Sequence, residues 1–139
     1  MSEKRKVRVL LADDEAHVRL FVKTVVGSMG CEVVAEAADG RQALELFDKT
    51  TPDLVLLDIN MPVMDGITAL KELRRKSDSV AIVMLTSLAS AEVVEQCLEA
   101  GANYHLRKDL PVNELKQEIR DTWLAHLQDL KGTAAGGAT

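Results

Sequence analysis

The stretch LLADDEAHVR (residues 10–19) carries an apolar run directly into two adjacent carboxylates, Asp13 and Asp14. Together with the residues before it, the run VRVLLA (7–12) has the β-branched and leucine content of a buried strand. Like charges at this spacing repel each other, so such a pair is stable only where a cation is expected. The stretch therefore predicts a buried strand that ends at a cation-binding site.

Short apolar runs alternate with longer stretches of helical periodicity along the rest of the chain. Strands are predicted at 7–12, 32–37, 53–58, 80–85 and 103–107, and helices at 15–29, 40–50, 67–76, 90–100 and 111–130. Strict alternation of this kind is typical of a parallel sheet with helices on both faces. We therefore predict a doubly wound, five-stranded α/β fold. Residues 1–130 should form one domain, and 131–139 a flexible tail that offers almost nothing to bury.

Composition and charge argue against several classes of function. A net charge of −5 argues against broad attraction to nucleic acid or anionic membranes. No apolar run approaches the length of a membrane span, and residues 1–10 lack the apolar core of a secretion signal. Cys31 and Cys97 have neither CxxC nor Cys/His ligand spacing, so we interpret them as small hydrophobes in a reducing compartment. We expect a cytoplasmic protein that does not itself contact DNA or membranes.

Polar side chains follow four of the five predicted strands. The first ends at Asp13 and Asp14 and the third at Asp58, while the fourth runs into Thr86 and the fifth is followed by Lys108. The carboxyl ends of parallel strands meet at one edge of the sheet, where the functional crevice of such folds lies. Clustered carboxylates favour Mg²⁺, and a hydroxyl with an ammonium can hold phosphoryl oxygens. The chain has no glycine-rich nucleotide loop, so a phosphoryl donor must come from another molecule, and a carboxylate must receive the group.

The motifs LLADDE, PDLVLLDINMPVMDG, VMLTS and GANYHLRKD, taken in order, resemble the receiver domain of two-component response regulators over residues 6–128. The resemblance implies a flavodoxin-like fold with strand order 2-1-3-4-5. It identifies Asp58 as the acceptor of a phosphoryl group from a sensor histidine kinase or a phosphotransfer protein. It also implies that Asp14 and Asp58 bind Mg²⁺ directly, that Asp13 binds it through water, and that Asn60 offers its backbone carbonyl. Thr86 and Lys108 would bind the phosphoryl oxygens.

The resemblance also implies a switch. In receivers the threonine-bearing strand end, here Thr86, moves towards the phosphate while a side chain of the fifth strand turns inward. That side chain is usually Tyr or Phe and is His105 here, which could make the switch sensitive to pH. A surface imidazole without a switching role is the alternative. Many receivers have Lys-Pro, often with a cis peptide, where this chain has Lys108-Asp109, so cis geometry is not expected.

Four further positions carry expectations. Gly66 in the turn MDG is expected to need permissive backbone angles. Leu88, two residues after Thr86, is implied by the resemblance to limit access of water to the site. On the last helix, Trp123 is more typical of packing than of partner contact, and partner contact stays open for His126.

Two functions from different classes remain open. The first is a receiver that phosphorylates and dephosphorylates itself and is not a turnover enzyme. It would signal to an effector through its fourth helix, fifth strand and fifth helix, and whether phosphorylation produces a homodimer stays open. The second is the receiver part of a longer LuxR-type DNA-binding regulator, because the Lys108-Asp109 pair resembles the one in receivers that precede such a DNA-binding domain. An aspartyl phosphatase is disfavoured, because position 60 is Asn rather than a general acid.

Overall fold

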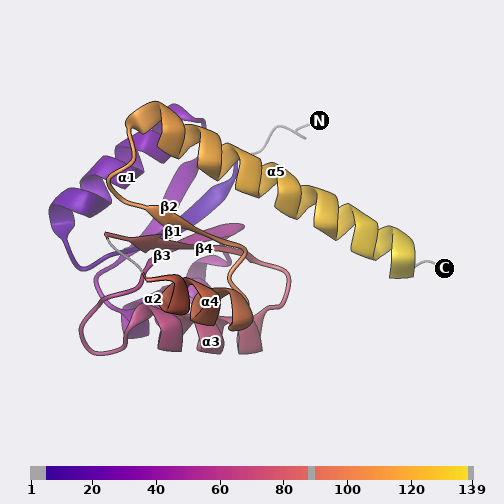
Figure 1. Cartoon of the computed structure of the whole chain (residues 1–139), viewed down its shortest axis with the longest axis horizontal. Helices are drawn as coiled ribbons and strands as arrows, with labels where there is room; N and C mark the ends of the chain where they lie inside the picture. The colour runs from indigo at the N-terminus through magenta and orange to yellow at the C-terminus, as the bar shows by residue number, and fades with distance from the viewer. Residues whose placement is uncertain (1–5, 88–89, 138–139) are drawn as a thin grey trace.

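The chain folds into three layers, with helices on both sides of a central sheet (Figure 1). The computed structural model describes residues 6–87 and 90–137, and for residues 132–137 the course of the backbone only. The elements are β1 (Arg8–Ala12), α1 (Ala16–Ser28), β2 (Glu32–Ala37), α2 (Gly40–Thr50), β3 (Leu54–Asp58), α3 (Gly66–Lys76), β4 (Ala81–Thr86), α4 (Ala91–Glu99), β5 (Tyr104–Arg107) and α5 (Val112–Gly137). The predicted alternation is confirmed.

The sheet is parallel throughout, and its strands lie in the order β2-β1-β3-β4-β5. The expected flavodoxin-like order is therefore confirmed. Strand β3 lies between β1 and β4, and every one of its residues is buried. Because both faces of a central parallel strand are covered, its sequence LVLLD is almost continuously apolar and ends in the one carboxylate, Asp58.

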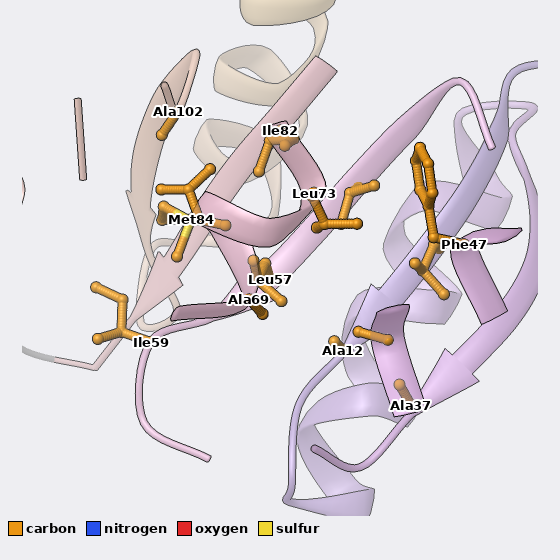
Figure 2. Packing of buried hydrophobic residues seen from close by; sticks show 14 of the residues in the cluster. Ala12, Ala37, Phe47, Leu57, Ile59, Ala69, Leu73, Ile82, Met84 and Ala102 are labelled. Carbon is orange, nitrogen blue, oxygen red and sulfur yellow. The ribbon is translucent and has the colours of Figure 1, made fainter. Parts of the chain in front are cut away.

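Two apolar clusters lie on opposite faces of the sheet. Helices α1 and α5 cover one face, and α2, α3 and α4 cover the other (Figure 1). Figure 2 shows side chains of the cluster under α2, α3 and α4, where Leu73 of α3 lies among strand residues such as Leu57 and Ile82. Each of these side chains is fully buried, and burial of one such side chain contributes about 1.5–3 kcal/mol to stability.

Helix ends follow local sequence signals. The side chains of Asp39, Asp65 and Ser90 each accept a hydrogen bond from a backbone N–H in the first turn of α2, α3 and α4. Gly30 and Gly101 follow α1 and α4 with φ of 88° and 109°, a conformation that glycine adopts without steric cost.

Helix α5 is longer than the sequence predicted. It continues to Gly137 rather than ending at residue 130, and it extends well past the edge of the sheet (Figure 1). Once a packed helix exists, each added residue fixes few dihedrals for one hydrogen bond, so the helix propagates without tertiary contacts. The domain boundary after residue 130 and the flexibility of the tail stay predictions. None of the described helices is both long and apolar enough to span a membrane.

Candidate functional site

The predicted polar residues gather at the carboxyl edge of the sheet. Asp13 follows β1, and Asp58 and Thr86 are the last residues of β3 and β4. Lys108 follows β5, and its backbone N–H donates a 2.8 Å hydrogen bond to the carbonyl of Thr86. Because β1 and β4 both pair with β3, the three strand ends lie side by side. The sheet thus brings together groups that are far apart in the sequence.

Three carboxylates form a compact cluster. Asp13, Asp14 and Asp58 each offer an oxygen, and these oxygens lie within 4.8 Å of one another. Asp13 and Asp58 are only 0% and 3% exposed, whereas Asp14 is exposed to solvent. The cluster is therefore accessible from one side, through Asp14, and closed on the other.

The ammonium of Lys108 contacts two of these carboxylates. Its Nζ lies 2.7 Å from Oδ2 of Asp13 and 3.0 Å from Oδ1 of Asp58. Burial by itself lowers the pKa of Lys108, but the interactions with both carboxylates outweigh burial and raise the pKa above its ordinary value. The ammonium thus keeps its charge and offsets part of the negative charge of the cluster.

Asp58 is held as a weak acid. Burial raises its pKa to about 6, and the charge of Asp13 acts in the same direction, while Lys108 and a backbone hydrogen bond from Asn60 oppose the rise. A carboxylate with a raised pKa is a better nucleophile than an ordinary one, since basicity and nucleophilicity rise together within one class of group. At neutral pH Asp58 still carries its charge and can attack an electrophile.

The donor set fits a hard divalent cation. Oδ1 of Asp13 accepts a 2.9 Å hydrogen bond from the backbone N–H of Glu15. Oδ2 of Asp13 is buried and has no well-aligned hydrogen-bond donor within the described residues, although the Lys108 ammonium is close. Mg²⁺ takes oxygen ligands and usually keeps several waters. The site matches these preferences, since it offers Oδ2 of Asp13, two further carboxylates and access for water. The three carboxylates can therefore hold Mg²⁺.

The remaining predicted residues lie close to this cluster. Asn60 is exposed, and its backbone N–H rather than its side chain bonds to Asp58. Its predicted carbonyl ligand role stays a prediction. Thr86 is 2% exposed at the end of β4. Leu88 lies outside the described residues.

His105 lies at the middle of β5, where it pairs with Met84 of β4. Its neighbours in the strand, Tyr104 and Leu106, pack into the α1/α5 cluster, so the side chain of His105 points to the other face, towards α4. The imidazole is partly buried, and its Nδ1 has no hydrogen-bond partner within the described residues. The imidazole is therefore not fully exposed, and its role in a switch stays a prediction. The described residues, Lys108-Asp109 among them, contain no cis peptide bond.

The β3–α3 loop differs from the sequence prediction. Gly66 does not adopt positive φ; instead, a Cβ at this position would collide with the backbone carbonyl of Asp58. The strained residue is Val63, at φ 67°, where the N–H of Met64 bonds to the carbonyl of Pro62 at 2.7 Å. No local pattern indicates this conformation, because valine is among the residues least suited to it. Gly66 thus serves close packing behind Asp58.

The fold and the site together are a parallel sheet of flavodoxin-like strand order with three clustered carboxylates and a lysine at its carboxyl edge. A family model described as "Response regulator receiver domain" matches residues 9–120. The chemotaxis protein CheY of Bacillus subtilis is 38% identical over 115 residues, which are 83% of this chain and 96% of that protein. The chain belongs to the response regulator receiver family.

Other relatives are longer or have solved structures. The transcriptional regulatory protein PdtaR of Mycobacterium tuberculosis is 40% identical over 108 residues, 78% of this chain but only 52% of that protein. A chain of the CheX-CheY-BeF3-Mg+2 complex from Borrelia burgdorferi superposes with a TM-score of 0.80 at 29% identity, covering 84% of this chain and 88% of that one. A LuxR-family response regulator from Aurantimonas sp. gives a TM-score of 0.79 at 32% identity, with 84% of each chain covered. The chain thus spans nearly all of some relatives and about half of others.

Proposed function

We propose that Asp58 accepts a phosphoryl group from a phosphohistidine on a sensor histidine kinase or a phosphotransfer protein. The observation that supports this most directly is the contact of a buried carboxylate, Asp58, with Lys108 beside two further carboxylates. In the transfer, the bond between phosphorus and the histidine nitrogen breaks as a bond between phosphorus and a carboxylate oxygen of Asp58 forms. Mg²⁺, when bound, supplies the positive charge that lets an anionic group approach three carboxylates.

The chain's own residues orient and neutralise the group. Asp13 and Asp14 would hold the metal together with Asp58 and the carbonyl of Asn60, and Lys108 would donate to a phosphoryl oxygen from the position it occupies beside Oδ1 of Asp58. The hydroxyl of Thr86 donates to a second oxygen. The same site exposes the acyl phosphate to water, so the protein also dephosphorylates itself. The name of the Borrelia complex, which pairs BeF3 and Mg²⁺ with a relative, supports this assignment.

The output is a change in protein contacts. Thr86 moves towards the phosphoryl group, His105 turns inward beneath it, and the surface formed by α4, β5 and α5 changes shape. The exposed side of α4 carries Glu92, Glu95 and Glu99, and this favours an effector with basic side chains at the contact. Receiver domains in general are signalling modules that meet kinases, phosphotransfer proteins and effectors. The cytoplasmic location stays a prediction.

The chemistry is tested by intact mass after incubation with acetyl phosphate and Mg²⁺. The wild type should gain one phosphoryl group, Asp58→Ala should gain none, and Asp48→Asn, an exposed acid of α2 that pairs with Lys76, should behave as the wild type. Chelation of Mg²⁺ should abolish the adduct. An adduct that persists in Asp58→Ala would show that another residue is the acceptor.

A second candidate is the receiver part of a longer DNA-binding regulator. The transcription regulators among the relatives, of which the chain spans about half, favour it, as does the LuxR-family neighbour. Size-exclusion chromatography of the phosphorylated protein separates the two. A shift to a dimer supports a regulator that pairs on DNA, and an unchanged monomer supports a receiver that acts on another protein.

A further inference from the structure

Arg74 connects three segments at the end of the sheet opposite the carboxylates. Its Nε donates to the carbonyl of Gly101 at 2.7 Å, and its Nη1 donates to the carbonyls of Val80 at 2.6 Å and Ser77 at 3.2 Å. Its Nη2 donates to Oδ1 of Asn103 at 2.8 Å. The guanidinium therefore ties α3 to the segments that lead into β4 and β5.

These contacts fix the orientation of the Asn103 amide. Its Oδ1 accepts not only from Arg74 but also from the backbone N–H of Ile82, at 2.9 Å. A flipped amide would place its NH₂ group against two donors, so the oxygen must face them. The Nδ2 of Asn103 is then directed at Nδ1 of His126, 3.3 Å away. Asn103 can only donate in this contact, and His126 can only accept.

The contact therefore defines the protonation state of His126. An imidazole that accepts at Nδ1 is neutral and carries its proton on Nε2. The ring is only 6% exposed on α5, and its centroid lies 5.5 Å from that of the Trp123 ring. Trp123 and His126 thus pack against the domain, which favours packing over partner contact for both. A proton on Nδ1 would face the NH₂ of Asn103 and destroy the hydrogen bond.

The charges around the ring act in both directions. Burial lowers the pKa of His126 below its ordinary value, and the positive charge of Arg74 on α3 lowers it further. A backbone hydrogen bond with Ser79 and the charge of Asp129 oppose the shift. The clefts that His126 lines also contain further acids, Asp53 before β3 and Glu118 and Asp121 on α5 itself, as well as Tyr104 of β5.

We propose that His126 is a proton-sensitive latch that holds α5 against the base of the sheet when it is neutral and releases the following turns when it is protonated. Two clefts of about 300 and 410 Å³ border the ring, and they give water access to an imidazolium as it forms. Beyond His126 the large apolar side chains of the helix are only partly covered, since Leu127 and Leu130 are 37% and 39% exposed. The Asn103–His126 hydrogen bond therefore provides a larger share of the interactions that hold this part of α5 to the domain than one hydrogen bond would provide in a fully buried core.

Nitrogen-detected NMR of the imidazole, recorded from pH 4.5 to 8, tests the latch on the full chain. At pH 7.5 His126 should be neutral with its proton on Nε2, and it should titrate below about 6.5, the ordinary imidazole value. Amide hydrogen exchange, corrected for the intrinsic effect of pH, should rise about tenfold over residues 127–131 as His126 protonates, and not in β3. A proton on Nδ1 at pH 7.5, or protonation without faster exchange in α5, would overturn the proposal.

Two variants separate a proton switch from plain packing. Asn103→Asp keeps an acceptor for Arg74 and Ile82 but replaces the donor with a second acceptor, so His126 should titrate at least one pH unit higher and the helix should stay protected at low pH. His126→Gln offers an acceptor that does not titrate, so exchange in residues 127–131 should become independent of pH. If both variants keep the pH response of the wild type, another group is responsible and the latch is refuted.

Discussion

The Nζ of Lys108 lies 3.0 Å from Oδ1 of Asp58, and the same ammonium also contacts Asp13. The ammonium thus supplies positive charge to two carboxylates, one that follows β1 and one that ends β3. Because Mg²⁺ would be held by the same group of carboxylates, we expect the ammonium and the metal to compete for them.

Lys108→Gln should lower the free energy of unfolding in the absence of Mg²⁺ by about 3 kcal/mol, because it leaves buried carboxylates without a cation. It should also bind Mg²⁺ more tightly, since the competing charge is gone. Urea unfolding with and without Mg²⁺ measures both effects. Lys76→Gln, which removes an exposed lysine paired with Asp48, is the control and should change neither. Equal Mg²⁺ affinity in Lys108→Gln and the wild type would contradict the competition.

Asp58→Asn should stabilise the metal-free protein at neutral pH. The folded pKa of Asp58 is about 6, above its unfolded value of 3.8, so the folded state binds more protons in that window. The resulting stability is fully present below pH 3.8 and is lost as the pH rises through 6. The variant should be more stable than the wild type by about 2 kcal/mol at pH 7.5, and the difference should shrink towards pH 4. Unfolding curves at both pH values check the sign, and a difference that is independent of pH would contradict it.

Gly66→Ala should damage the site without altering any polar residue. The new Cβ would collide with the backbone carbonyl of Asp58 and displace this carboxylate, the proposed phosphoacceptor. We expect a loss of about 2–3 kcal/mol in unfolding free energy and a large fall in the rate of phosphorylation. Gly27→Ala is the matched control, because no atom lies within 4 Å of its added Cβ in α1. That variant should be stabilised by about 0.5–1 kcal/mol, and similar outcomes for the two would refute the packing role of Gly66.

Val63→Asn should increase stability. Val63 adopts a φ of 67° and is 78% exposed, so its side chain brings strain and little burial. Asparagine tolerates this conformation, and relief of the strain should add about 1 kcal/mol to the unfolding free energy. Val63→Thr keeps the branched Cβ and should add nothing. Equal stability of the two variants in urea would show that φ at position 63 is not a source of strain.

Sequence reasoning predicted the element order and the site because both depend on local patterns. The apolar runs that end at Asp13, Asp58 and Thr86 indicate where three of the strands end, and the parallel sheet then brings these ends together. The strand order came from the family resemblance, since periodicity does not determine which strands pair.

Other features depend on contacts that no local pattern encodes. The close approach of Gly66 to Asp58 is a long-range packing constraint, and the strain of Val63 contradicts the propensity of its residue type. The sequence underestimates the length of α5 because residues 131–139 offer almost nothing to bury, whereas an existing helix can continue without tertiary burial. His126 gave no signal in the sequence, since its role depends on an amide whose orientation two distant donors determine.

The sheet also lies between the two apolar clusters, one under α1 and α5 and the other under α2, α3 and α4. Leu70 of α3 and Ile119 of α5 belong to different clusters, so we expect the effects of substitutions at these two positions to add. Each layer can therefore accumulate neutral substitutions without constraint from the other. The helical surface that meets an effector can diverge while the strands between the layers keep the carboxylates in place.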